Sequence, residues 1–231
     1  MKDKNNRINR WISPISLVFI IAAVLAGAVI FDEALYSYIS MAVALASFVP
    51  LIFSFESKNQ GTQRLVIIAV MTALSVAGRI LFAFAPSFKP VSAFTIITGT
   101  YMGKEAGFVS GALAALISNF YFGQGPWTPF QMLSFGLTGF AAGCFRGWLE
   151  RNRTSLYIFG ALCGLFYSFL MDIWTVLWAD KCFNLSRYFA AVATAAPITA
   201  VYAFSNVFFL VILAKPFGQI FDRLHKKYGF E

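Results

Sequence analysis

The chain has 231 residues, of which 59% are hydrophobic and only 12% are charged, and its formal net charge is +8. Soluble domains are near half apolar and a quarter charged, so this composition indicates a protein whose main solvent is the lipid bilayer. The positive charge does not indicate nucleic-acid binding, because the basic residues fall in short segments between apolar stretches and not on one soluble face.

Apolar stretches of the roughly 20 residues needed to cross hydrocarbon recur along the chain. Charges and turn residues divide them into eight predicted helices, one of them short. These cover residues 12–31, 35–55, 64–86, 91–103, 105–122, 129–148, 155–179 and 188–214. The alternating pattern of membrane β-strands does not recur, so we predict an all-α membrane protein.

The first apolar stretch follows a basic head, as a secretory signal would, but it is longer than a signal core and further spans follow it. We expect it to be retained. With a cytoplasmic N-terminus, fourteen basic residues fall in inner loops and three, Lys89, Lys181 and Arg187, in outer loops. The positive-inside rule therefore predicts a multi-pass protein of the cell membrane with both termini cytoplasmic.

The uncharged segment 106–145 is too long for one helix, and the glycines and prolines at 123–129 predict a helical hairpin with an outward tip. Residues 91–103 are too few to cross a full bilayer unless they tilt or neighbours shield them, so we expect protein to cover this segment. Small residues recur at every fourth position, for example Gly99/Gly103 and Gly107/Gly111, which predicts close helix packing.

Two ionisable residues, Arg79 and Asp172, fall within predicted spans, where an isolated charge costs several kcal/mol. Each lies seven residues before the expected outer end of its helix, so the two could pair at equal depth. One interpretation makes them a charged floor or wall of an outward-facing cavity. The other makes them an internal ion pair, or an arginine that reaches the headgroups.

The hairpin tip, residues 119–131, combines aromatic surface with amide and hydroxyl groups, as small-molecule sites do. An aromatic belt at the membrane interface would explain its aromatic residues but not its amides. The candidate binding residues of the tip are Asn119, Tyr121, Gln124, Trp127 and Gln131. Trp174 and Trp178 precede the next outer loop and could wall the same site or belong to the belt.

Catalytic and metal-binding patterns are missing from the sequence. The three cysteines, Cys144, Cys163 and Cys182, are widely spaced, and His225 is the only histidine, so we predict no metal, no cofactor and no enzymatic activity. A phosphate-binding G-x-x-x-x-G-K-[ST] motif is also missing, so ATP-driven work would come from partner subunits. After Pro216, apolar residues at helical spacing predict an amphipathic cytoplasmic tail on the membrane surface or on a partner.

Residues 64–145 resemble the substrate-specific S component of energy-coupling factor (ECF) vitamin transporters. The resemblance lies in Ala69-Val-Met-Thr-Ala73, in Gly78-Arg79 with Pro86, in the segment Gly99 to Gly111, and in the tip Gly123-Gln-Gly-Pro-Trp-Thr-Pro129. It implies a six-helix bundle with both termini inside. We therefore divide the chain into a two-helix extension (1–60), a substrate-binding core (61–215) and the tail (216–231).

The resemblance also implies that Ala69 and Ala73 pack on a membrane scaffold subunit and that two cytoplasmic ATPases drive the cycle. The outer loops 86–91, 121–129 and 179–187 would close over a vitamin, and we add Phe94 to the candidate binding residues. Cobalamin or another corrinoid is the favoured ligand. Folate, pantothenate and a queuosine-like precursor stay open, as do a stand-alone carrier and a lipid-modifying membrane enzyme.

Overall fold

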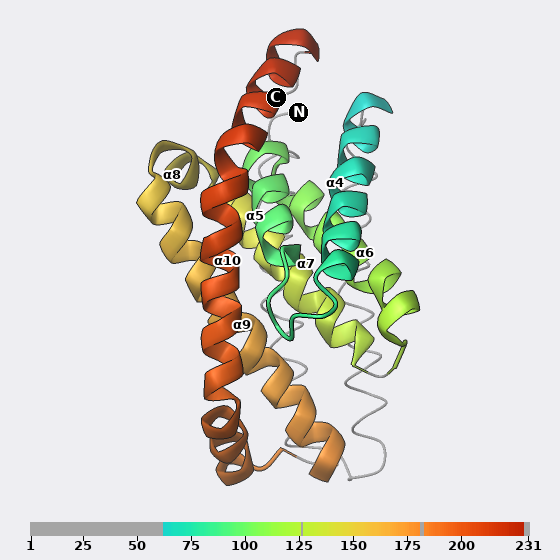
Figure 1. Cartoon of the computed structure of the whole chain (residues 1–231), viewed down its shortest axis with the longest axis vertical. Helices are drawn as coiled ribbons and strands as arrows, with labels where there is room; N and C mark the ends of the chain where they lie inside the picture. The colour runs from blue at the N-terminus through green and yellow to red at the C-terminus, as the bar shows by residue number, and fades with distance from the viewer. Residues whose placement is uncertain (1–61, 126, 181–182, 229–231) are drawn as a thin grey trace, which may run out of the picture.

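The computed structural model describes residues 62–125, 127–180 and 183–228, and within these residues every regular element is a helix. This confirms the predicted all-α class. Figure 1 shows α4 (Thr62–Leu81), α5 (Val91–Met102), α6 (Lys104–Phe122), α7 (Thr128–Cys144), α8 (Arg146–Arg151), α9 (Arg153–Asp180) and α10 (Leu185–Tyr228). The two helices predicted before residue 60, and the domain boundary there, lie outside the described residues.

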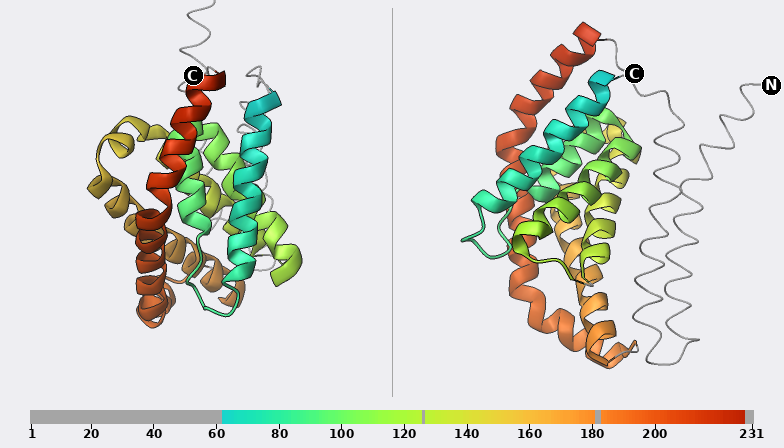
Figure 2. Two further views of the ribbon diagram at one scale, coloured as in Figure 1. Left: turned by 45° about the horizontal axis from the view of Figure 1, so that its top comes forward. Right: turned by 90° about the vertical axis from the view of Figure 1, so that its right-hand side faces the viewer.

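Helix α5 forms the centre of the bundle and contacts each of the other described helices. Eleven of its residues are buried. The expectation that protein covers this short segment is therefore confirmed, and its backbone is not left facing lipid. Around it, α6 packs along α7 and α9 packs along α10, and the side view in Figure 2 shows α4 crossing the bundle beside α5.

The two ends of the bundle differ in charge. Helix α4 begins and α10 ends at the same end (Figure 1), which we call the basic end, because Arg64, Arg146 and Lys227 belong to the helix ends found there. By length and composition, α4, α9 and α10 can each cross a membrane, and α5 is a shorter apolar helix. The cytoplasmic location of the termini stays a prediction.

Helix α4 ends five residues earlier than predicted, at Leu81, and Pro86 lies in the loop 82–90 that follows. Phe82 and Phe88 of this loop contact each other, and both contact Phe209 of α10, at ring-centroid distances of 5.0–6.0 Å. Burial of these rings stabilises a compact loop in place of a last helical turn. Arg79 is consequently in the last turn of α4, where the helix dipole favours a cation.

The tail after Pro216 is not a separate interfacial helix, because α10 continues through this proline to Tyr228. Phe217 contacts Phe94 edge-on at 5.5 Å, and Phe221 stacks on Tyr101 at 5.1 Å. A proline inside a helix removes one backbone hydrogen bond, and the burial of these rings against α5 offsets that loss. Phe217 and Phe221 of the tail therefore pack on the bundle, while Ile220 is exposed.

Glycines bring α5, α6 and α7 into backbone contact. A Cβ added at Gly107 would lie 2.6 Å from the Gly99 Cα and would also meet the Gly139 backbone, far closer than ordinary packing. The prediction that small residues permit close helix approach is confirmed at these positions. Gly103, with φ +92°, forms the tight turn from α5 into α6 at the basic end.

Candidate functional site

A buried polar network joins three helices at the end of the bundle opposite the basic end. The Arg79 guanidinium of α4 donates to Ser118 Oγ and, at 2.9 Å, to Asn119 Oδ1 of α6. The Asn119 amide then donates to Thr128 Oγ1 at 3.0 Å and to Gln131 Oε1 at 2.9 Å, both on α7. Asn119 is only 1% exposed. These five residues, which we call the polar network, therefore hold α4, α6 and α7 together.

The hairpin tip is ordered by the same threonine. Thr128 Oγ1 donates to Gln124 Oε1 at 3.0 Å and accepts from the Gly125 backbone N–H at 3.2 Å, while Gln124 Nε2 donates to the Leu116 carbonyl at 2.9 Å. Pro129 lies in the first turn of α7, where a missing N–H costs no helical hydrogen bond. The Gln124 amide thus binds Thr128 and the backbone of α6, and its contact with a ligand stays a prediction.

Positive charge gathers beside the network without a matching acid. The Phe122 ring contacts both the Arg79 guanidinium, at 4.8 Å from its centroid, and the Lys89 ammonium, at 4.4 Å. Among the described residues no carboxylate lies within ion-pair distance of either cation. Partial burial, and secondarily Arg79, lower the pKa of Lys89 below its ordinary value. An anionic group would therefore be stabilised here.

The possible ion pair between Arg79 and Asp172 does not form. Arg79 binds neutral acceptors of α6, and Asp172 Oδ2 is buried with no hydrogen-bond partner in the described part of the chain. Helix α4 stops at Leu81, whereas α9 continues to Asp180 and extends past the end of α4 (Figure 1). Asp172 is thus a separate polar group on α9.

Tryptophans of α9 meet the start of α7. Trp174 contacts the Trp127 ring edge-on at 6.1 Å and the Phe130 ring at 6.4 Å, and it stacks on Trp178 at 5.6 Å. We call these four residues the aromatic wall. Trp178 is 52% exposed and Tyr121 is 64% exposed. Trp127 and Trp178 are therefore linked through Trp174, and Tyr121 lies on the surface against Phe122.

Phe94 also lies apart from the polar network. It is buried in the main core against Phe217, and none of its described contacts is with the polar network. Sequence reasoning did not single out Ser118, Thr128, Lys89 or Phe122. The sequence did contain a signal for two of them: Ser118 next to Asn119, and Thr128 within the proline-rich tip, are polar residues in a mostly apolar hairpin without charges.

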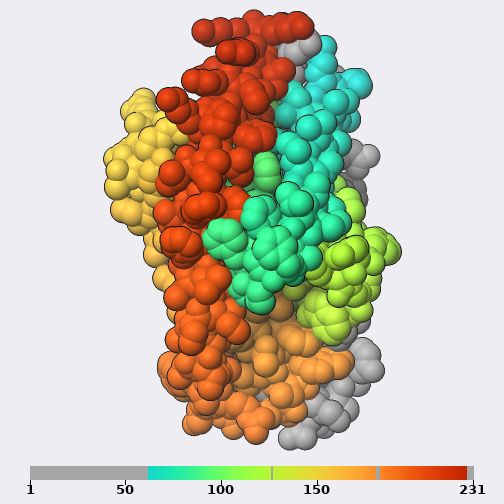
Figure 3. All heavy atoms as spheres, viewed as in Figure 1, coloured from blue at the N-terminus to red at the C-terminus, as the bar shows by residue number. Residues whose placement is uncertain are grey.

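The loop 82–90 is fastened to α10 next to this site. The Lys89 backbone N–H donates to Ser205 Oγ at 2.9 Å, and Ser205 Oγ donates to the Lys89 carbonyl at 3.1 Å. The Phe88 ring packs on Phe208 at 5.3 Å. Figure 3 shows the loop lying against α10 on the visible face. These contacts hold the Lys89 side chain beside Phe122.

A second feature is an apolar groove between α4 and α6, with a volume of about 540 Å³. Ala69 and Ala73 lie in it, with Leu113 and Ile117 on the facing helix. Leu65, Val66 and Val70 are exposed on the same helix. Small side chains flanked by exposed large ones form a surface into which another apolar helix can pack closely.

No cluster of three or more His, Cys, Asp or Glu side chains suited to a metal ion is found among the described residues.

Residues 59–223 match a family model described as the ECF-type riboflavin transporter, S component. The match covers most of the chain and includes the polar network, the aromatic wall and the groove, and it begins after the two predicted N-terminal helices. No curated protein and no solved structure matches the chain.

Proposed function

The chain belongs to the family of ECF-type riboflavin transporter S components, and on this premise we propose that the polar network and the aromatic wall bind the vitamin. Membership makes the protein a vitamin-uptake subunit of the plasma membrane and not an enzyme. S components of this type work with an ECF module of a membrane scaffold and ATPases. Capture from the outer side and delivery inward through that module is the proposed role of this chain.

The observation that carries the proposed site is the uncompensated positive charge of Arg79, whose hydrogen bonds lead through Asn119 to the start of α7, where the aromatic wall begins. Burial of an arginine whose described acceptors are neutral costs free energy, and an anionic group that approaches the guanidinium offsets this cost. Rings at the hairpin tip and on α9 supply apolar surface for a planar ligand. Ligand sites typically combine an apolar, often aromatic surface with a few polar groups.

The charge also bears on which vitamin is bound. Riboflavin, for which the matched family is named, has a planar ring system but no charged group. Cobalamin carries a phosphodiester, which Arg79 and Lys89 could neutralise, and its many amides suit a polar site. We propose cobalamin or a related corrinoid as the ligand, with riboflavin as the second candidate because of the family match.

The basic end is the proposed cytoplasmic end, because basic residues favour that side of the membrane. The polar network then lies toward the outside, where a vitamin arrives. The groove with Ala69 and Ala73 is the proposed contact with the scaffold, since small residues allow two helices to approach closely.

The test begins with protein purified in detergent and denatured, so that any bound small molecule is released and identified by mass spectrometry. Cobalamin and riboflavin are then each titrated onto ligand-free protein. We expect cobalamin to bind, Trp127→Ala to weaken it at least tenfold, and Lys89→Gln to weaken it about fivefold by removing one charged contact worth about 1 kcal/mol.

Matched controls replace like residues away from the site. Trp148→Ala removes an exposed tryptophan of α8 at the basic end and should leave the affinity within twofold. Riboflavin binding with the same sensitivity to Trp127→Ala would support vitamin capture here and reject the corrinoid. Binding of neither vitamin, or equal losses in Trp127→Ala and Trp148→Ala, would reject the proposed site.

A further inference from the structure

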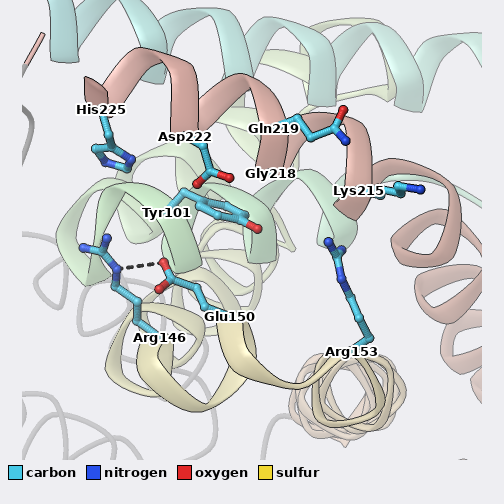
Figure 4. A pocket seen from close by; sticks show the side chains of 9 residues that line it. All are labelled: Tyr101, Arg146, Glu150, Arg153, Lys215, Gly218, Gln219, Asp222 and His225. Carbon is cyan, nitrogen blue, oxygen red and sulfur yellow. Dashed lines mark hydrogen bonds and ion pairs between the residues drawn. The ribbon is translucent and has the colours of Figure 1, made fainter. Parts of the chain in front are cut away.

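A polar cavity of about 510 Å³ lies at the basic end of the bundle, opposite the end that holds the polar network. Figure 4 shows its walls: the last third of α10 above, α8 and the start of α9 below, and the Tyr101 side chain of α5 between them. Its volume falls within the roughly 300–1,000 Å³ typical of small-molecule sites.

Packing of the tail creates this space. Tyr101 stacks on Phe221 with the ring planes 2° apart, and a Cβ at Gly218 would lie 2.6 Å from the Tyr101 hydroxyl. The tyrosine ring therefore closes the apolar side, and its hydroxyl faces the polar residues of the cavity (Figure 4). Helix α10 turns its polar face, including Lys215 and Asp222, toward α8 and α9.

The charges in the cavity fall into two groups. On one side Arg146 pairs with Glu150 at 2.9 Å, and Asp222 lies nearby (Figure 4). On the other side Arg153 and Lys215 come from different helices, and no carboxylate of the described chain lies within ion-pair distance of either one. Two cations without an ion-pair partner thus border a cavity that also presents the Tyr101 hydroxyl.

We propose that this cavity binds a phosphate group through Arg153 and Lys215. A guanidinium can hold two phosphate oxygens at once, an ammonium adds a point charge, and the Tyr101 hydroxyl can donate to a third oxygen. The phosphate can belong to an anionic phospholipid headgroup, because basic pockets between membrane helices on the cytoplasmic side bind such headgroups, or to a soluble phosphate ester. This site is separate from vitamin capture and does not depend on the identity of the vitamin.

The test uses the full chain, purified and delipidated, with two probes. Native mass spectrometry follows the binding of phosphatidylglycerol against phosphatidylcholine, and calorimetry follows glycerol 3-phosphate. The variant R153Q/K215Q removes both cations, which are exposed and therefore tolerant of substitution. The variant R151Q/R223Q removes two exposed cations, one of α8 and one of α10, that do not line the cavity.

We expect one equivalent of phosphate ligand on the wild type, at least a tenfold weaker affinity in R153Q/K215Q, and less than a twofold change in R151Q/R223Q. Selective loss of phosphatidylglycerol identifies a lipid site, and selective loss of glycerol 3-phosphate identifies a soluble ester. Equal losses in the two double variants, or no binding of either probe to the wild type, overturn the proposal. Lys215→Gln alone provides the same comparison if the double variant does not fold.

Discussion

Asn119 accepts one hydrogen bond from Arg79 and donates two to α7, so Asn119→Ala removes three buried hydrogen bonds at once. The charge-assisted bond contributes about 2 kcal/mol and each neutral bond about 1 kcal/mol, which gives a loss of about 4 kcal/mol. For a chain of this size each kcal/mol lowers the melting temperature by about 2–4 °C, so we expect a decrease of about 8–16 °C.

Thermal unfolding in detergent, followed by tryptophan fluorescence, measures this decrease. Asn152→Ala is the control, because Asn152 is exposed and accepts one hydrogen bond, from the Thr154 N–H at 2.9 Å. Loss of such a cap costs about 1 kcal/mol, or about 2–4 °C. If Asn119→Ala shifts the melting temperature no more than Asn152→Ala does, the polar network does not hold the three helices together.

Gly139→Ala should lower the melting temperature by several degrees, because overpacking costs about 1–3 kcal/mol and the new methyl would meet backbone atoms; Gly147→Ala, with open space around it, should not lower it. The lowered pKa of Lys89 means that the unfolded chain binds more protons between the folded and unfolded pKa values, so stability should rise with pH through that window. Binding of an anionic ligand should weaken as the pH rises through the same window. Lys89→Gln should remove both pH dependences, which are measured by thermal unfolding and by ligand titration at a series of pH values. Ala69→Leu with Ala73→Leu should fill the groove and abolish co-purification of scaffold and ATPases, and unchanged co-purification would place the contact elsewhere.

Much of the fold was predictable because helix length and hydrophobic content are local properties. The helices α5, α6 and α9 begin and end within two residues of their predicted bounds. The errors occurred where a tertiary contact competes with a local signal. Pro86 is too weak a signal to locate the end of α4, because aromatic packing of loop 82–90 decides it. Pro216 suggests a break in α10 that packing against α5 overrides.

The candidate site was predictable in part. The hairpin tip with Asn119, Trp127 and Gln131 could be located, because amides and glycine–proline turns are conspicuous within uncharged helices. Their roles could not be assigned from spacing. Asn119 and Gln131 bind each other in the structure, whereas Lys89, which looked like an ordinary loop charge, lies beside Phe122.

Composition and residue spacing are enough to identify an all-α membrane protein, most of its described helices, and an uncharged hairpin that carries amides and aromatic rings. Helix packing, and not residue spacing, pairs Arg79 with Ser118 and Asn119 and places the α10 tail against the core. The physical reason is that partner choice depends on the rotation and axial offset of each helix. Those quantities are set by contacts between distant segments, such as the Gly107–Gly139 backbone approach, and not by the spacing of residues along one helix.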